Sequence, residues 1–257
     1  MSLAAPTAAT HSSNNNTKQP PSKFTITAHP TTDIWRAPPS TRRFNAPLAH
    51  TSRGPLSSFF RAGLSLALPL PSPSAGDRLL LYDQGGLVLG ISRHSGAGGG
   101  GGGDGEQVVS DGGDGDGWPS RWLKAGIEMF EGEPWLSVVG CDRWSDVSMV
   151  PLSWGSRGGG GSERKEEEER PTARVEVERA KEDALRVYWV VPVAADGVGG
   201  EKRVLIREAN WFFAPEGGEE EGWDVSVAAY AARPLRNEKD VDEVLDVDFE
   251  RFEVEWL

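Results

Sequence analysis

The chain has 257 residues, a formal net charge of −12 at pH 7 and 37% hydrophobic residues, among them ten tryptophans. The charge disfavours nucleic acids and anionic membranes as partners, because both require clustered Lys and Arg side chains. The single cysteine, Cys141, excludes an intramolecular disulfide and a Cys-rich zinc site, and it is typical of a reducing compartment.

The N-terminal segment, residues 1–23, is rich in Ser, Asn and Pro and has no hydrophobic period, which predicts a disordered tail. It lacks the basic start and apolar run of a signal peptide. No stretch of the chain approaches the roughly 20 apolar residues that cross a bilayer. With the lone cysteine, these features predict a cytoplasmic protein, with the nucleus as the alternative.

From Phe24 onward, short stretches of alternating apolar and polar residues predict β-strands. In 63–70, the leucines at even positions share one face. In 78–91, two apolar runs flank Asp83-Gln84-Gly85-Gly86, which predicts a hairpin of two buried strands. Further strands are expected at 23–28, 122–130, 174–179, 184–193, 203–214, 223–232 and 248–257. No stretch has the pattern of a long amphipathic helix, so the chain is predicted to be all-β and antiparallel.

Glycine-rich and acidic tracts separate the predicted strands at about 95–117, 155–170, 194–203 and 215–222. Such tracts bury too little apolar surface to offset the entropy lost on ordering, so flexible loop insertions are expected there. Strand patterns continue on both sides of each tract. The tracts are therefore placed inside a single domain of residues 24–257.

The stretch at 121–140 predicts a hairpin with an unusual face. As a strand, it points Trp122, Lys124 and Glu128 to one side and apolar residues to the other. Lys124 and Glu128 are then roughly 13 Å apart at ~3.3 Å per residue, too far for direct contact. A face mixing tryptophan, a base and an acid is typical of a polar ligand surface, and a solvent-side or cross-strand ion pair is the alternative.

The register of this hairpin follows from where its turn is placed. A turn centred on Gly132-Glu133 sets Glu128 opposite Ser137 and Lys124 opposite Cys141, and it joins the apolar sides of both strands.

The run at 122–152, together with 207–214, 227–234 and 249–256, resembles the concanavalin A-like family of unknown biochemical function that includes the fungal regulation-of-enolase protein. The most specific matches are Lys124-Ala125-Gly126-Ile127-Glu128 and Asp142-Arg143-Trp144-Ser145-Asp146. The resemblance implies a concanavalin A-like jelly-roll sandwich of two antiparallel sheets, here with long Gly-rich and acidic insertions. Relatives of this architecture bind sugars across the concave face of one sheet. A shared fold alone does not establish that this chain does the same.

Two functions are open at this point. In the first, a non-catalytic binding module holds a carbohydrate-like or small polar ligand on its concave face. The candidate ligand-binding residues are Trp122, Lys124, Glu128, Arg143, Trp144 and Asp146, with Glu208, Tyr230 and Arg233 as a second set. In the second, an interaction scaffold regulates a metabolic enzyme such as enolase. An exposed Trp122 in an open groove favours a ligand, whereas a Trp122 buried under loops favours the scaffold.

Glycoside hydrolysis is the third alternative. It requires two carboxyl groups about 5 Å apart in a retaining enzyme, or about 6.5 to 9.5 Å apart in an inverting one. The best acidic alternations, at 246–250 and 253–255, look like the solvent face of an edge strand without aromatic surroundings. The four histidines are scattered, and Asp111, Asp114 and Asp116 lack the spacing of a calcium loop. We therefore expect no catalytic residue, no metal and no cofactor.

Overall fold

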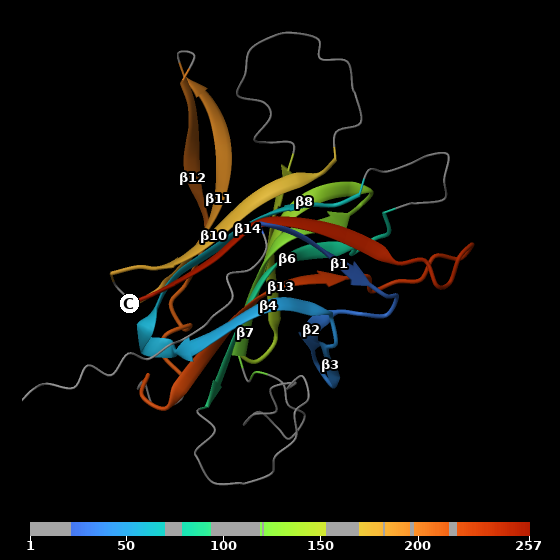
Figure 1. The fold of residues 1–257 in the computed structure, drawn as a ribbon. Coiled ribbons are helices and arrows are strands. Elements are labelled where there is room, and N and C mark those ends of the chain that lie inside the picture. The colour runs from blue at the N-terminus through green and yellow to red at the C-terminus, as the bar shows by residue number, and fades with distance from the viewer. Residues whose placement is uncertain are drawn as a thin grey trace, which may run out of the picture.

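The computed structural model describes residues 22–69, 79–93, 119, 121–152, 170–181, 183–195, 198–215 and 220–257. These residues form two six-stranded antiparallel sheets that pack face to face (Figure 1). The predicted fold class, an all-β jelly-roll sandwich of two antiparallel sheets, is confirmed. None of the described segments forms an apolar helix of the length that a bilayer crossing needs.

The first sheet contains, from edge to edge, β1 (Lys23–Ala28), β14 (Leu245–Trp256), β5 (Phe59–Ala67), β10 (Thr172–Arg179), β11 (Leu185–Ala195) and β12 (Val198–Ala209). The second sheet contains β4 (Leu48–Pro55), β13 (Trp223–Ala232), β6 (Gln84–Arg93), β7 (Arg121–Phe130), β8 (Glu133–Cys141) and β9 (Ser145–Pro151). A separate two-stranded ribbon consists of β2 (Ile34–Ala37) and β3 (Thr41–Phe44).

The core lies between the two sheets and follows the two-residue period of the strands. Leu64 and Leu66 of β5 are buried there with Leu123 and Ile127 of β7. Each fully buried leucine contributes about 1.5–3 kcal/mol relative to an exposed one. Because alternate residues of β7 fill this core, Trp122, Lys124 and Glu128 lie on the outer face of the second sheet.

The ribbon of β2 and β3 covers part of this outer face (Figure 1). Ile34 packs there with Val88, Trp122 and Val139 in a second apolar cluster, outside the main core. The ribbon is also tied to the sheet edge, because the Arg36 backbone N–H donates a 2.8 Å hydrogen bond to the Ser145 hydroxyl. The sequence patterns had not indicated these two strands.

The predicted hairpin around 83–86 is wrong. Gln84 to Arg93 form one continuous strand, β6, which pairs with β7 and β13. Gly86 pairs directly with Gly126, and a Cβ at Gly126 would lie 1.9 Å from the Gly85 oxygen. The glycines therefore serve close approach of two strands rather than a turn.

The β7–β8 turn sits one residue earlier than predicted. Glu131 and Gly132 have φ of 52° and 81°, and a two-residue turn of this kind matches the twist of the flanking strands. Glu128 is therefore opposite Trp135, and Lys124 is opposite Val139. Each residue of β7 therefore pairs with the β8 residue two positions earlier than predicted, and because two is an even number every side chain keeps its predicted face.

Two further expectations about the chain differ from the structure. β14, predicted at a sheet edge, lies between β1 and β5. Residues 198–203, expected in a flexible insertion, belong to β12 and pair with β11. The expected tail and the insertions at about 95–117 and 155–170 fall almost wholly outside the described residues.

Candidate functional site

Polar side chains gather on the outer face of the second sheet, around the paired glycines Gly86 and Gly126. Gln84 and Glu128 face each other across β6 and β7, Tyr230 of β13 is opposite Gly86, and Ser137 of β8 is opposite Gly126. Asp33, just before β2, approaches from the covering ribbon. We name six residues the polar cluster: Asp33, Gln84, Lys124, Glu128, Ser137 and Tyr230.

Lys124 is the central residue of the polar cluster and is only 2% exposed. Its Nζ donates a 2.6 Å hydrogen bond to Gln84 Oε1 and lies 4.0 Å from Asp33 Oδ1. It is also 5.9 Å from the centroid of the Tyr230 ring. Burial lowers the pKa of the Lys124 amine, and the nearby Glu128 and Asp33 carboxylates oppose that effect only in part.

The other polar groups of the cluster also lie in a dry environment. Burial raises the pKa of Asp33 despite the Lys124 amine and a 2.8 Å hydrogen bond from the Ile34 N–H. Burial likewise raises the pKa of Tyr230, whose hydroxyl donates to Gln84 Oε1 at 3.3 Å. Glu128 differs from its neighbours because it is half-buried and reaches the surface. It accepts a 2.8 Å hydrogen bond from the Ser137 hydroxyl.

This arrangement gathers charged and hydrogen-bonding groups in a dry environment. An isolated buried charge costs several kcal/mol, and buried groups with shifted pKa values gather at functional sites. The Glu128 carboxylate is an acceptor near the surface, whereas the donors on Lys124, Ser137 and Tyr230 are buried and, like the Trp122 indole, reach a ligand only if the covering residues move. It contains no histidine, and the described part of the chain holds no group of His, Cys, Asp and Glu side chains placed to bind a metal ion.

Burial of Lys124 gives a prediction for the pH dependence of stability. Its folded pKa lies below its ordinary value of 10.5, so the unfolded chain binds the extra proton between these two values. The free energy of unfolding should therefore rise with pH in that window, and this contribution is lost as pH falls through the folded pKa. Urea unfolding of wild type and Lys124→Met from pH 7 to 10 measures it as a gain in the stability of wild type relative to the variant as the pH rises. A constant difference would contradict the prediction.

Trp122 lies beside Lys124 on the outer face but is 1% exposed. The ribbon covers it, and Phe44 of β3 packs edge-on against its indole at 6.3 Å between ring centroids. Trp122 therefore cannot touch a ligand unless the ribbon moves.

Arg143, Trp144 and Asp146 are not brought to the polar cluster. Arg143 lies 5.9 Å from the centroid of the Trp144 ring, at the turn between β8 and β9. Asp146 is opposite Gly140, on the face turned away from Lys124. Its carboxylate accepts a 2.8 Å hydrogen bond from Arg207 of β12, which links the edges of the two sheets.

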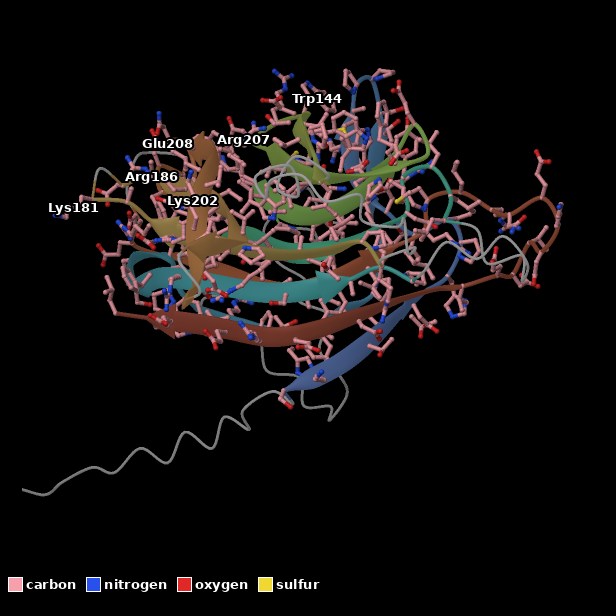
Figure 2. All side chains as sticks on the ribbon, turned by 90° about the horizontal axis from the view of Figure 1, so that it is seen from above. Trp144, Lys181, Arg186, Lys202, Arg207 and Glu208 are labelled. Atoms are coloured by element: carbon pink, nitrogen blue, oxygen red, sulfur yellow. The ribbon has the colours of Figure 1, made fainter. Side chains whose placement is uncertain are left out.

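The second set of candidates divides in the same way. Tyr230 belongs to the polar cluster, whereas Arg233 forms a buried ion pair with Asp83, with Nη2 2.9 Å from Oδ2. Glu208 pairs with Arg186 at 2.7 Å on the β11–β12 hairpin. Figure 2 shows this pair well separated from Trp144.

Three members of the polar cluster were missed from the sequence: Asp33, Gln84 and Ser137. Gln84 stands in the stretch interpreted as a turn, and Asp33 lies outside every predicted strand. Of the three, only Ser137 could have been found from the sequence, because the predicted register set it opposite Glu128. In the structure the two side chains are joined by a hydrogen bond.

Comparison with known proteins places the chain in a family. The family described as "Protein of unknown function (DUF1349)" matches residues 10–256. The chain belongs to DUF1349. An uncharacterized protein of Emericella nidulans, AN7484, is 34% identical over 214 residues, covering 83% of this chain and 78% of that protein.

A solved structure supports the fold of this DUF1349 chain. A functionally unknown protein from Saccharomyces cerevisiae is similar with a TM-score of 0.53 and 20% identity, over 92% of this chain and 89% of that chain. A laminarinase from Flavobacterium sp. UMI-01 aligns with a TM-score of only 0.35 and 10% identity, over 77% of this chain and 67% of that chain. That weak likeness carries no argument about activity.

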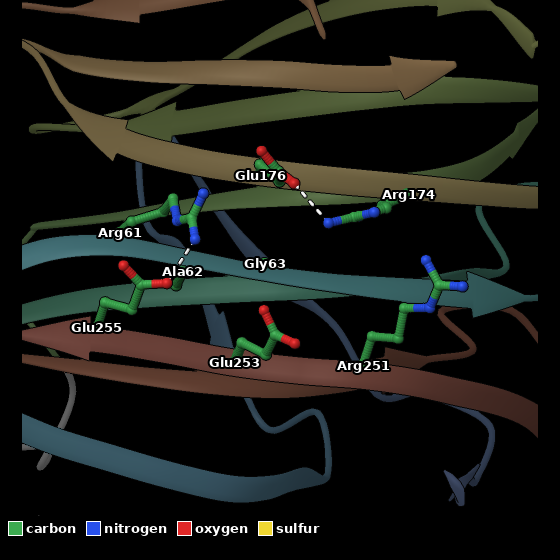
Figure 3. A pocket seen from close by; sticks show the side chains of 8 residues that line it. All are labelled: Arg61, Ala62, Gly63, Arg174, Glu176, Arg251, Glu253 and Glu255. Carbon is green, nitrogen blue, oxygen red and sulfur yellow. Dashed lines mark hydrogen bonds and ion pairs between the residues drawn. The ribbon is translucent and has the colours of Figure 1, made fainter. Parts of the chain in front are cut away.

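The outer face of the first sheet of this DUF1349 chain holds a shallow depression with Gly63 at its floor (Figure 3). Glu176 and Glu253 are both opposite Gly63, from β10 and β14. Arg174 engages Glu176 at 2.8 Å, and Arg61 engages Glu255. The Arg61–Glu255 pair is exposed, and pairs of that kind contribute about 0–1 kcal/mol, whereas the Glu176 carboxylate is buried beneath Arg174 and Arg203, which both pair with it. We interpret the depression as a charged, solvated sheet face rather than a site.

Proposed function

We propose that this protein is a non-catalytic binding protein that holds a carbohydrate-like or other small polar ligand at the polar cluster. One observation carries the proposal: the Lys124 amine is buried beside a neutral amide at 2.6 Å, with the Asp33 carboxylate at 4.0 Å. A lysine buried only for stability would be expected in a close ion pair. A polar ligand would satisfy the amine further, because an ammonium has three donors.

Binding is favoured over catalysis by the composition of the cluster. Hydrolysis by two carboxyl groups would need Asp33 and Glu128 as an acid and a nucleophile or base. Asp33 is buried at 8% exposure, at the start of the covering ribbon and beside Lys124, whereas Glu128 is already hydrogen-bonded by Ser137. The donors and acceptors instead surround the glycine pair, an arrangement suited to holding a ligand in one orientation.

The test is a thermal-shift screen of the purified protein against mono- and oligosaccharides and phosphosugars, repeated on Lys124→Met. Methionine keeps the buried volume, whereas alanine would leave a cavity that destabilises the fold by itself. A ligand at 100 times its Kd should stabilise wild type by about 2.7 kcal/mol, a rise of several degrees in Tm. We expect Lys124→Met to lose this rise.

The matched control is Lys202→Met, which removes an exposed lysine of β12 on the other sheet (Figure 2). It should respond to ligand as wild type does. Equal ligand shifts in Lys124→Met and Lys202→Met would refute the assignment of the polar cluster.

A second candidate function is an interaction scaffold that regulates a metabolic enzyme such as enolase. The observation in its favour is Trp122, which is 1% exposed beneath the ribbon and is not part of an open groove. This alternative predicts that no small ligand shifts the Tm of wild type. It also predicts that the protein co-elutes with purified enolase in size-exclusion chromatography.

A further inference from the structure

Three aromatic side chains lie at the end of the polar cluster where Glu128 reaches the surface. Tyr82 precedes β6, Phe130 ends β7, and Trp135 of β8 is directly opposite Glu128. The ring centroids of Tyr82 and Phe130 are 6.2 Å apart, and those of Phe130 and Trp135 are 6.4 Å apart. We name these three residues the aromatic rim. It continues the same outer face beyond Glu128.

The aromatic rim is held in place by hydrogen bonds. Trp135 Nε1 donates to the Phe130 carbonyl at 3.1 Å, and the Tyr82 N–H donates to the Met129 carbonyl at 2.7 Å. Gln84 Nε2 donates to the Tyr82 carbonyl at 3.1 Å, which connects the rim to the partner of Lys124. A ligand on the rim and a ligand on the cluster would therefore share one rigid surface.

Tyr82 has two further features of a ligand contact. Its φ of 68° lies in the left-handed region, which is unfavourable for a residue with a side chain and recurs where ligands are clamped. Its side chain is nevertheless exposed, at 38% for the whole residue, together with Leu81 at 40%. An aromatic ring that is backbone-anchored and still open to solvent is a ready stacking surface.

We infer that the aromatic rim is a stacking subsite and that the ligand of the polar cluster is a neutral oligosaccharide; this inference rests on the proposed function. A pyranose ring presents an apolar face of C–H groups, which an indole or phenol ring covers. Its equatorial hydroxyls donate hydrogen bonds to a carboxylate. Trp135 and Glu128 stand opposite each other and provide these two contacts.

The charge around the rim selects a neutral ligand over a phosphosugar or a nucleotide. Glu131 and Glu133 are exposed at the β7–β8 turn beside the rim, and Glu128 adds a third carboxylate. The chain as a whole carries a net charge of −12. Like charges brought together disfavour binding, so a phosphate group would be repelled here.

The length of the surface selects an oligosaccharide over a monosaccharide. The ring centroids of Tyr82 and Phe130 are 6.2 Å apart, and those of Phe130 and Trp135 are 6.4 Å apart. The Lys124 amine lies close to this row of rings, because Gln84 accepts from the amine and donates to the Tyr82 carbonyl. A ligand that stacks on more than one of these rings and also contacts the cluster contains several linked sugar rings.

The experiment is calorimetric titration of the full chain with neutral gluco- and manno-oligosaccharides, their monosaccharides and glucose 6-phosphate. Wild type is compared with Tyr82→Ala, Trp135→Ala, Lys124→Met and the control Trp144→Ala, which removes a half-buried tryptophan outside the site. We expect about tenfold weaker oligosaccharide binding in both rim variants, the value of one stacked ring, and no change in the control. Tyr82→Ala alters an exposed side chain, so it remains informative if Trp135→Ala fails to fold.

The outcomes separate the two proposals. Oligosaccharide binding that survives in both rim variants but is lost in Lys124→Met overturns the stacking subsite and leaves the proposed function standing. Tighter binding of glucose 6-phosphate than of neutral oligosaccharides overturns the assignment of a neutral ligand. Equal affinity for a monosaccharide and its oligosaccharides overturns the extended site. Failure of every probe to bind wild type overturns both the inference and the proposed function.

Discussion

Replacing Arg233 with alanine should lower the free energy of unfolding by about 3–5 kcal/mol, the usual cost of removing one partner of a buried ion pair. Arg233 and Asp83 are 3% and 0% exposed at their side chains, and two hydrogen bonds of 3.1 and 2.9 Å join them. The guanidinium also donates to the Glu243 and Val244 carbonyls, so it links the start of β6, the end of β13 and the chain before β14.

Urea unfolding measures this effect, and Arg186→Ala is the matched control. Arg186 pairs with Glu208 on an exposed hairpin, where both side chains are more than a third exposed, and its loss should cost about 0–1 kcal/mol. Burial raises the pKa of Asp83 although Arg233 opposes that effect, so an unpaired Asp83 carboxylate would be left in a dry site. An Arg233→Ala variant as stable as wild type that fails to bind ligand would show instead that Arg233 serves the site.

Gly126→Ala should be the second severe variant, with a loss of about 1–3 kcal/mol or more in the free energy of unfolding. A Cβ at this position would lie 1.9 Å from the Gly85 oxygen and 2.6 Å from the Gly86 Cα, and both atoms belong to the backbone of β6. The two strands would have to separate. Because Gly126 lies between Lys124 and Glu128, ligand binding should fail as well.

Gly200→Ala in β12 is the matched control, since its Cβ would meet the Val193 side chain at an ordinary 3.4 Å. Alanine there should leave stability unchanged or raise it by about 0.5–1 kcal/mol. Chemical unfolding and ligand-induced shifts in Tm, measured on both variants, test the expectation. Equal stability of the two glycine variants would show that β6 and β7 can part without cost.

Local pattern predicted those parts of the site that share one strand. The period of two alone placed Trp122, Lys124 and Glu128 on one face of β7, and the structure keeps them there. That prediction survived an error in the turn position, because the shift was even. The same pattern failed to predict the strand at Gly85 and Gly86. Glycine occurs both in turns and where two backbones approach closely, and the sequence alone does not distinguish the two.

The sequence by itself determined most of the strands, the all-β class and the identity of the mixed face, because alternation is a property of consecutive residues. Only the tertiary structure decided which side chains contact that face. Gln84 bonds Lys124 at a sequence separation of 40 residues, and Asp83 pairs with Arg233 at a separation of 150 residues. The covering of Trp122 by β2 and β3 is decided in the same way. Such contacts depend on strand order and sheet packing, which hydrophobic period does not encode.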